Sequence, residues 1–136
     1  MPTLPWAAAQ IVAHPPIGTE VVVMASRFQV AAWRDVPPFL LKAMRIRRQM
    51  LKSEGAIGVS LIAQPVHRTF YTLSAWRDRD ALDSAVATSP HADTMAQFRS
   101  KMASSLFTFW AIPASGNIRP SWAEAHERLR NQASQQ

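Results

Sequence analysis

Two side chains are the main candidates for a chemical role, and His91 is the first. It opens a helical pattern directly after Ser89 and Pro90, where the oriented amides of a first helical turn favour a neutral imidazole. A neutral imidazole can accept a proton from a phenol or an acidic carbon, so we predict that His91 is a catalytic base. The structural alternative is a capping or hydrogen-bonding histidine.

Arg47 is the second, because it lies near the middle of an apolar helical stripe. Positions that share one face at about 100° per residue are Val36, Phe39, Leu40, Ala43, Ile46 and Met50. A guanidinium keeps its charge and is costly to bury without a partner, so we predict that Arg47 holds a carboxylate, phenolate or enolate. Arg47 would instead have a structural role if it formed an ion pair with an acid such as Asp83. The same holds if its aliphatic part packed on the core and its guanidinium lay in water.

Small polar and large aromatic side chains share one face of a predicted strand, where they would suit a ligand pocket. These residues are Phe70, Thr72, Ser74 and Trp76. We predict that Trp76, Phe70 and Ser74 bind substrate, the alternative being that the aromatics belong to the core. Ser26 is a further candidate; it and Arg27 point to opposite faces of their strand, and the sequence does not say which of them faces the pocket.

The elements that must position these residues follow from their periodicity. Apolar and β-branched runs predict strands at 19–32, 57–63, 68–76 and 106–112, and helices are predicted at 36–54, after Asp78 and after Ser89. The order β-α-β-β-α-β predicts a ferredoxin-like α+β fold, a four-stranded antiparallel sheet with helices on one face. We expect 1–18 to be an extended arm without regular structure because it contains four prolines, 19–113 to be the domain, and 114–136 to be an extension with a short helix and a polar tail.

Two of these strands are apolar on both faces, at 21–25 and 106–112. The helices cover only one face of the sheet, so the second face needs another cover. A homodimer that packs two sheets face to face is the prediction, with Tyr71 in the interface. The N-terminal arm and the C-terminal helix would be an alternative cover.

The composition restricts the partners. The 136 residues include 15 Lys and Arg against 9 Asp and Glu, with a formal net charge of +6, which is compatible with nucleic acid, an acidic membrane or an anionic small molecule. The basic stripe of Lys42, Arg45, Arg48 and Lys52 has no interleaved aromatics for stacking bases, which argues against nucleic acid. No apolar run approaches the roughly 18 residues that span a bilayer, and we expect a cytoplasmic protein.

The residue types also exclude several kinds of site. There is no cysteine, so no thiolate nucleophile, disulfide or Cys-ligated metal is possible. The four histidines, His14, His67, His91 and His126, have no metal-ligand spacing, and we predict no metal. A glycine-rich phosphate loop is also absent.

The segment 72–76, which ends in Trp76, is followed by 77–82 and then by Ser89-Pro90-His91. This pattern resembles the antibiotic-biosynthesis-monooxygenase-like family of dimeric α/β-barrel proteins over roughly residues 19–112. The resemblance implies a homodimer with a ligand pocket between the sheet and the helices of each subunit. It also implies a monooxygenase-like oxidoreductase that acts on an aromatic or polyketide-like substrate without a cofactor.

The same superfamily includes haem-degrading enzymes, whose signature residues this chain lacks. Met95 stands at the position of their axial histidine, Ala85 at that of a pocket tryptophan, and Ser26 near that of a first-strand asparagine. We therefore predict no cofactor. Haem remains only in the alternative hypothesis, a non-catalytic dimeric α/β-barrel protein that binds a hydrophobic ligand or haem.

Overall fold

The computed structural model describes residues 3–8, 19–88, 91–114 and 120–134, and a single antiparallel sheet forms its centre. The strands lie in the order β1-β3-β4-β2-β5. Their bounds are Thr3–Ala8 for β1, Glu20–Val30 for β2, Ala56–Gln64 for β3, Thr69–Trp76 for β4 and Met102–Pro113 for β5. Strand β2 pairs with β4 on one side and with β5 on the other, so β5 lies at an edge of the sheet.

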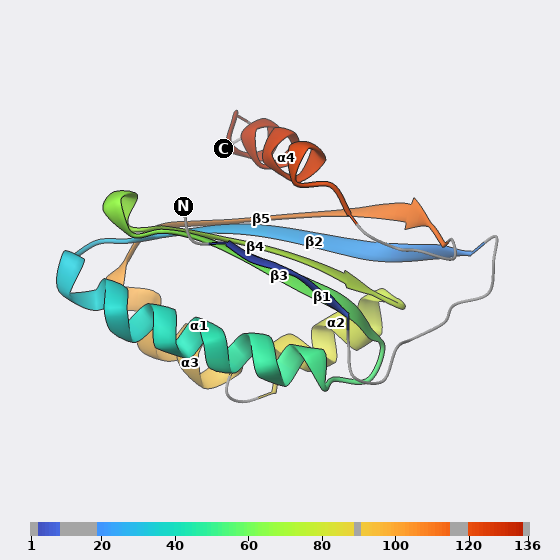
Figure 1. Cartoon of the computed structure of the whole chain (residues 1–136), viewed down its shortest axis with the longest axis horizontal. Coiled ribbons are helices and arrows are strands. Elements are labelled where there is room, and N and C mark those ends of the chain that lie inside the picture. The colour runs from blue at the N-terminus through green and yellow to red at the C-terminus, as the bar shows by residue number, and fades with distance from the viewer. Residues whose placement is uncertain (1–2, 9–18, 89–90, 115–119, 135–136) are drawn as a thin grey trace.

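The helices divide between the two faces of this sheet (Figure 1). Helices α1 (Val36–Leu51), α2 (Arg79–Val86) and α3 (His91–Phe98) lie along one face, and α4 (Trp122–Ser134) crosses the other. From β2 to β5 the chain follows the predicted β-α-β-β-α-β order, with α2 and α3 together in the place of the second helix, which confirms the α+β, ferredoxin-like class. The prediction of four strands is wrong, because the sheet has five.

The fifth strand, β1, falls in the segment predicted to lack regular structure because of its prolines. It is an edge strand, antiparallel to β3, with a register irregularity between Leu4 and Ala7. Proline is tolerated at sheet edges and irregularities because no ladder hydrogen bond is required there. Across the ladder, the ring of Trp6 occupies the space that a side chain on Gly58 would need. A glycine at position 58 therefore lets the edge strand approach closely.

Local capping explains where the shorter helices begin. The carboxylate of Asp78 accepts a hydrogen bond from the amide of Ala81 at 2.9 Å, as predicted for a helix that starts after Asp78. The hydroxyl of Ser121 accepts hydrogen bonds from two amides in the first turn of α4. Asp35, the predicted cap of α1, makes no such bond, and its carboxylate lies 4.0 Å from the Lys101 ammonium instead. The prolines that follow it are sufficient to start α1, because the first helical amides need no intrahelical partner.

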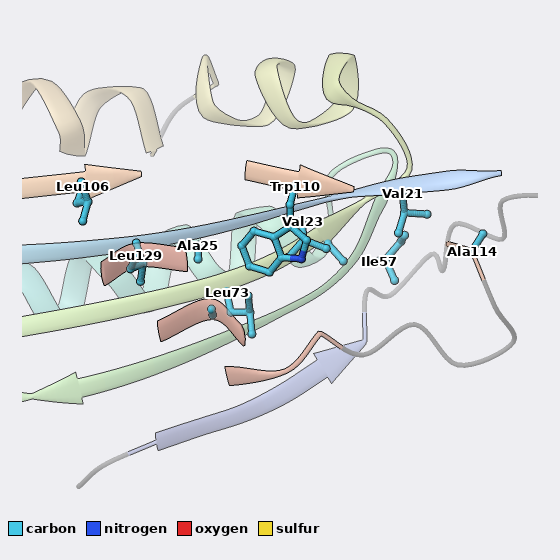
Figure 2. Packing of buried hydrophobic residues seen from close by; sticks show 11 residues of the cluster. Val21, Val23, Ala25, Ile57, Leu73, Leu106, Trp110, Ala114 and Leu129 are labelled. Carbon is cyan, nitrogen blue, oxygen red and sulfur yellow. The ribbon is translucent and has the colours of Figure 1, made fainter. Parts of the chain in front are cut away.

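The second face of the sheet is covered in part by this chain's own segments. The cluster shown in Figure 2 joins buried sheet residues, among them Val23, Leu73 and Trp110, to Leu129 of α4. Trp6 of β1 also packs against this cluster. The arm and the C-terminal helix thus cover part of the apolar face, which is the alternative that the sequence left open. A homodimer stays a prediction.

Candidate functional site: a pocket between the sheet and α1

A narrow apolar pocket lies between the sheet and α1, and it receives side chains from every strand except β1. The lining residues are Met24, Ser26, Phe28, Phe39, Ala43, Ile46, Arg47, Met50, Val59, Leu61, Phe70, Thr72, Ser74, Met95 and Phe107. Its interior offers about 40 Å³ of space that water can occupy, room for a few water molecules or one slender organic group. A larger ligand therefore requires side chains at the mouth to move.

Arg47 brings a positive charge to this apolar surrounding. The predicted stripe on α1 faces the sheet, and Arg47 lines the pocket together with its neighbours on that stripe. Its Nε is buried and has no hydrogen-bond partner. Among the described residues it makes no ion pair, and the acid named as a possible partner, Asp83, pairs with Arg79 at 3.0 Å. An unpaired guanidinium group in such a place can bind an anionic oxygen of a ligand.

Hydroxyl groups lie on the sheet side of the pocket. Ser26 and Thr72 are opposite each other on β2 and β4, and their hydroxyls share a hydrogen bond. The hydroxyl of Ser74 accepts a hydrogen bond from the indole nitrogen of Trp76 at 2.9 Å. Each hydroxyl has one donor and two acceptor positions, so Ser74 keeps its own proton for another acceptor. This pocket wall can therefore hydrogen-bond a ligand oxygen.

The predicted substrate-binding residues take different places around this pocket. Ser26, Ser74 and Phe70 line it together with Arg47, and Arg27 points to the other face, so the choice that the sequence left open falls on Ser26. Phe70 forms an edge-to-face pair with Phe39 of α1, with ring centroids 4.8 Å apart. The pocket therefore combines polar side chains with an aromatic wall.

Trp76 is not among the lining residues. It is fully buried beside Leu82 and Ala85 of α2. Its contact with the pocket is indirect, through the hydrogen bond to Ser74. Trp76 can therefore act on a ligand by holding the orientation of that hydroxyl.

His91 is the first residue of α3, but its side chain lies outside the described residues, as do Ser89 and Pro90, the predicted start of that helix. One turn further along α3, Met95 lines the pocket. The role of His91 as a base stays a prediction. Among the described residues, no three His, Cys, Asp or Glu side chains gather in a way that would hold a metal ion.

Two residues that the sequence did not mark as binding residues form the boundary of the pocket. Met95 and Phe107 line the pocket and also two open grooves beside it, of about 280 Å³ and 250 Å³. Phe107 is 38% exposed and meets Phe28 edge to face at 5.4 Å. No sequence pattern marks this position, because both faces of β5 carry large apolar residues and the edge position of the strand is a property of the sheet.

The model of the family DUF3291, a domain of unknown function, matches residues 42–135. The chain belongs to this family. The DUF3291 match begins within α1, so it includes Arg47 and α4 but neither β1 nor β2. No curated protein sequence matches the chain. None of the helices in the described part of the chain is long and apolar enough to cross a bilayer.

Solved structures with the same fold include SnoaB, described as a cofactor-independent oxygenase of Streptomyces nogalater. A variant of SnoaB aligns with a TM-score of 0.56 and 17% identity over 74% of this chain and 98% of its own. A Nitrosomonas europaea protein, provisionally assigned as an antibiotic biosynthesis monooxygenase, aligns with a TM-score of 0.59 and 12% identity over 74% and 93%. Rv0793 of Mycobacterium tuberculosis aligns with a TM-score of 0.60 and 17% identity over 73% and 100%. These likenesses confirm the fold of the antibiotic-biosynthesis-monooxygenase-like proteins.

Proposed function

We propose that this chain is a monooxygenase-like oxidoreductase that needs no cofactor and acts on a slender aromatic or polyketide-like substrate with an anionic oxygen. The observation that carries the proposal is the buried Nε of Arg47, which has no hydrogen-bond partner, in a pocket whose other walls are mainly apolar. An arginine with a purely structural role would normally be paired, because burying its polar atoms without a partner costs free energy. A ligand that supplies the missing negative charge removes that cost.

The pocket suits the binding of such a substrate in one orientation. The apolar body would lie against Phe70 and Phe39, and the anionic oxygen would lie at the guanidinium of Arg47. Ser26 and Ser74 would accept or donate hydrogen bonds to further oxygens on the sheet side. Apolar walls with a few placed polar groups are the usual composition of small-molecule sites.

The proposed chemistry begins with His91 removing a proton from an activated CH₂ group of the substrate. The resulting carbanion, delocalised as an enolate or phenolate, would be stabilised by Arg47 because negative charge develops where the guanidinium lies. The carbanion carbon then bonds to O₂, and the peroxide formed takes the proton back from His91. Loss of water leaves a carbonyl group, so one oxygen atom enters the substrate and the other leaves as water, with no external reductant.

The similarity to SnoaB supports this class of reaction, since that protein is described as a cofactor-independent oxygenase and shares the fold. Fold alone does not carry a reaction. For this chain, the charge of Arg47 in the pocket therefore carries more weight than the shared fold.

The rival function is a non-catalytic protein that binds a hydrophobic ligand or haem. The methionine-rich lining, with Met24, Met50 and Met95, favours it because methionine side chains adapt to ligands of varied shape. Haem would be far too large for a pocket of about 40 Å³ without a large rearrangement. A Soret shift on adding haem, lost in His91→Ala, would support this rival and contradict the cofactor-independent reaction.

We also propose that the protein is a homodimer. The outer side of the 12-residue strand β5 has no partner strand among the described residues, and Phe107 and Phe109 beside it are 38% and 39% exposed. Unpaired edges with apolar side chains favour pairing with another chain. Light scattering should give twice the 15.2 kDa mass of the chain; the monomer mass would contradict the proposal.

Oxygen consumption with a panel of phenols and ketones, from single-ring to polycyclic, tests the enzymatic proposal. Once a substrate is found, Arg47→Met should lower the turnover number by roughly 10²–10³-fold, the effect of removing one group that stabilises an oxyanion. His91→Ala should lower it by about 10²-fold or more. The matched control is Arg48→Met, an exposed arginine on the same helix that does not line the pocket. Unchanged turnover in both Arg47→Met and His91→Ala would overturn the proposal.

A further inference from the structure

A second hollow is lined by residues on the opposite face of the sheet, the face over which α4 lies in Figure 1. It is lined by Arg27 of β2, Tyr71 of β4, and His126, Leu129, Arg130 and Ala133 of α4. It offers about 300 Å³ of space that water can occupy and is open to solvent. Because its residues come from three elements, the hollow is a product of the tertiary fold and separate from the pocket of the proposed function.

The positive charge of this hollow has no counter-charge in the described structure. No carboxylate lines it, and none of the ion pairs between described residues includes Arg27 or Arg130. Of the two acids on α4, Glu124 pairs with Arg128, 3.6 Å away, and Glu127 does not line the hollow. Two guanidiniums therefore face one space that contains no acid.

His126 is partly buried beside this positive charge. Burial lowers the pKa of His126 below its ordinary value of 6.5, and the charge of Arg130 lowers it further. Its imidazole is therefore neutral at pH 7 and has one ring nitrogen that can donate a hydrogen bond and one that can accept.

The aromatic and apolar part of the wall is packed in place before any ligand arrives. The rings of Tyr71 and His126 meet edge to face with centroids 4.9 Å apart, and Trp122 stacks on the other side of His126 at 5.5 Å. Arg27 lies directly across the ladder from Tyr71. Leu129, which is 3% exposed, anchors α4 against the sheet. Such preorganisation lowers the entropy cost of binding.

We propose that this hollow binds the phosphate-type dianion of a small organic molecule. Two guanidiniums balance a double negative charge, whereas a monocarboxylate would leave one of them uncompensated. The Tyr71 hydroxyl and the His126 ring supply further hydrogen bonds from the wall. The volume of about 300 Å³ exceeds that of a phosphate group, so it leaves room for an organic part against Leu129 and Ala133.

Solution NMR at constant ionic strength tests this proposal, with inorganic phosphate and phenyl phosphate as probes. Tyr71 is the only tyrosine in the chain, so its ring signals report on the hollow without ambiguity. We expect saturable shifts of these signals, tighter binding of phenyl phosphate than of phosphate, and a rise in the pKa of His126 on binding, since a nearby anion favours the charged imidazole.

Variants separate a specific site from a general effect of net charge. Arg27→Gln and Arg130→Gln should each weaken phenyl phosphate binding about tenfold, as expected for loss of a charged hydrogen bond. Arg128→Gln, on the same helix but outside the hollow, removes the same charge and should leave binding within about twofold of that of the unmodified protein. Thermal melts followed by circular dichroism check that each variant is folded.

Three results would overturn the proposal. Chloride at equal ionic strength could produce the same shifts, acetate could bind as tightly as phosphate, or Arg128→Gln could weaken binding as much as Arg27→Gln. Each of them would mean that the hollow does not select a dianion. Equal affinity for phosphate and phenyl phosphate would refute the organic part of the ligand.

Discussion

Replacing Arg47 by methionine should make the protein more stable while it abolishes ligand binding. Nε of Arg47 is buried without a partner, and an unsatisfied buried donor costs about 1–3 kcal/mol. The side chain is only partly buried, so the low end applies, and a methionine of similar length retains the packing of the stem. We expect the free energy of unfolding to rise by about 1 kcal/mol and Tm by about 4 °C.

The assay is urea unfolding followed by tryptophan fluorescence, run beside thermal melts. Arg48→Met is the control, because Arg48 is exposed on the same helix and surface changes of this kind stay within about 0.5 kcal/mol. A loss of 1 kcal/mol or more in Arg47→Met would refute the reasoning. It would mean that the guanidinium makes a stabilising contact in the folded protein, and the pocket would then contain no charge available for a ligand.

Three further predictions concern the surroundings of the two sites. Trp76→Phe should lower the free energy of unfolding by about 2 kcal/mol in urea titrations, because a cavity forms and the hydrogen bond to Ser74 is lost; an unchanged stability would contradict the tight packing. Met95→Ala and Phe107→Ala should each tighten binding of a tricyclic phenol about tenfold in fluorescence titrations, since both side chains lie between the pocket and the grooves; weaker binding would show that they are walls. Folding stability should fall as pH drops below about 6.5 towards the lowered pKa of folded His126, because the unfolded state takes up the proton first; the same slope in His126→Gln would assign it to other groups.

Much of the fold follows from local sequence signals. The helix that begins after Asp78 and the strands at 57–63 and 68–76 are found within one residue of their predicted bounds. Capping carboxylates, prolines in a first turn and runs of β-branched residues act through neighbours in the chain, so they can be read without a structure. Strand β1 was missed for the converse reason: whether prolines forbid a strand depends on whether the strand lies at an edge, which only the assembled sheet decides.

The pocket was predictable in part. The helical period identified Arg47 as the one charge on an apolar stripe, and strand alternation placed Phe70 and Ser74 on one face. Alternation within one strand could not tell whether Ser26 or Arg27 faces α1, because that depends on the register between β2 and β4. Trp76 shares the face of Phe70, but α2 covers its end of the strand and removes it from the pocket.

The two proposed sites use consecutive residues of one strand. Ser26 points towards α1 and lines the pocket, and Arg27 points towards α4 and lines the second hollow. The sheet between them is a single layer of paired backbone, so a change in the side chain at one position leaves the other on its own face. A ligand in one site should therefore leave the side chains that line the other on their own face of the sheet. This separation explains how a chain with a net charge of +6 can place one guanidinium in an apolar pocket and two in an open hollow without their sharing a ligand.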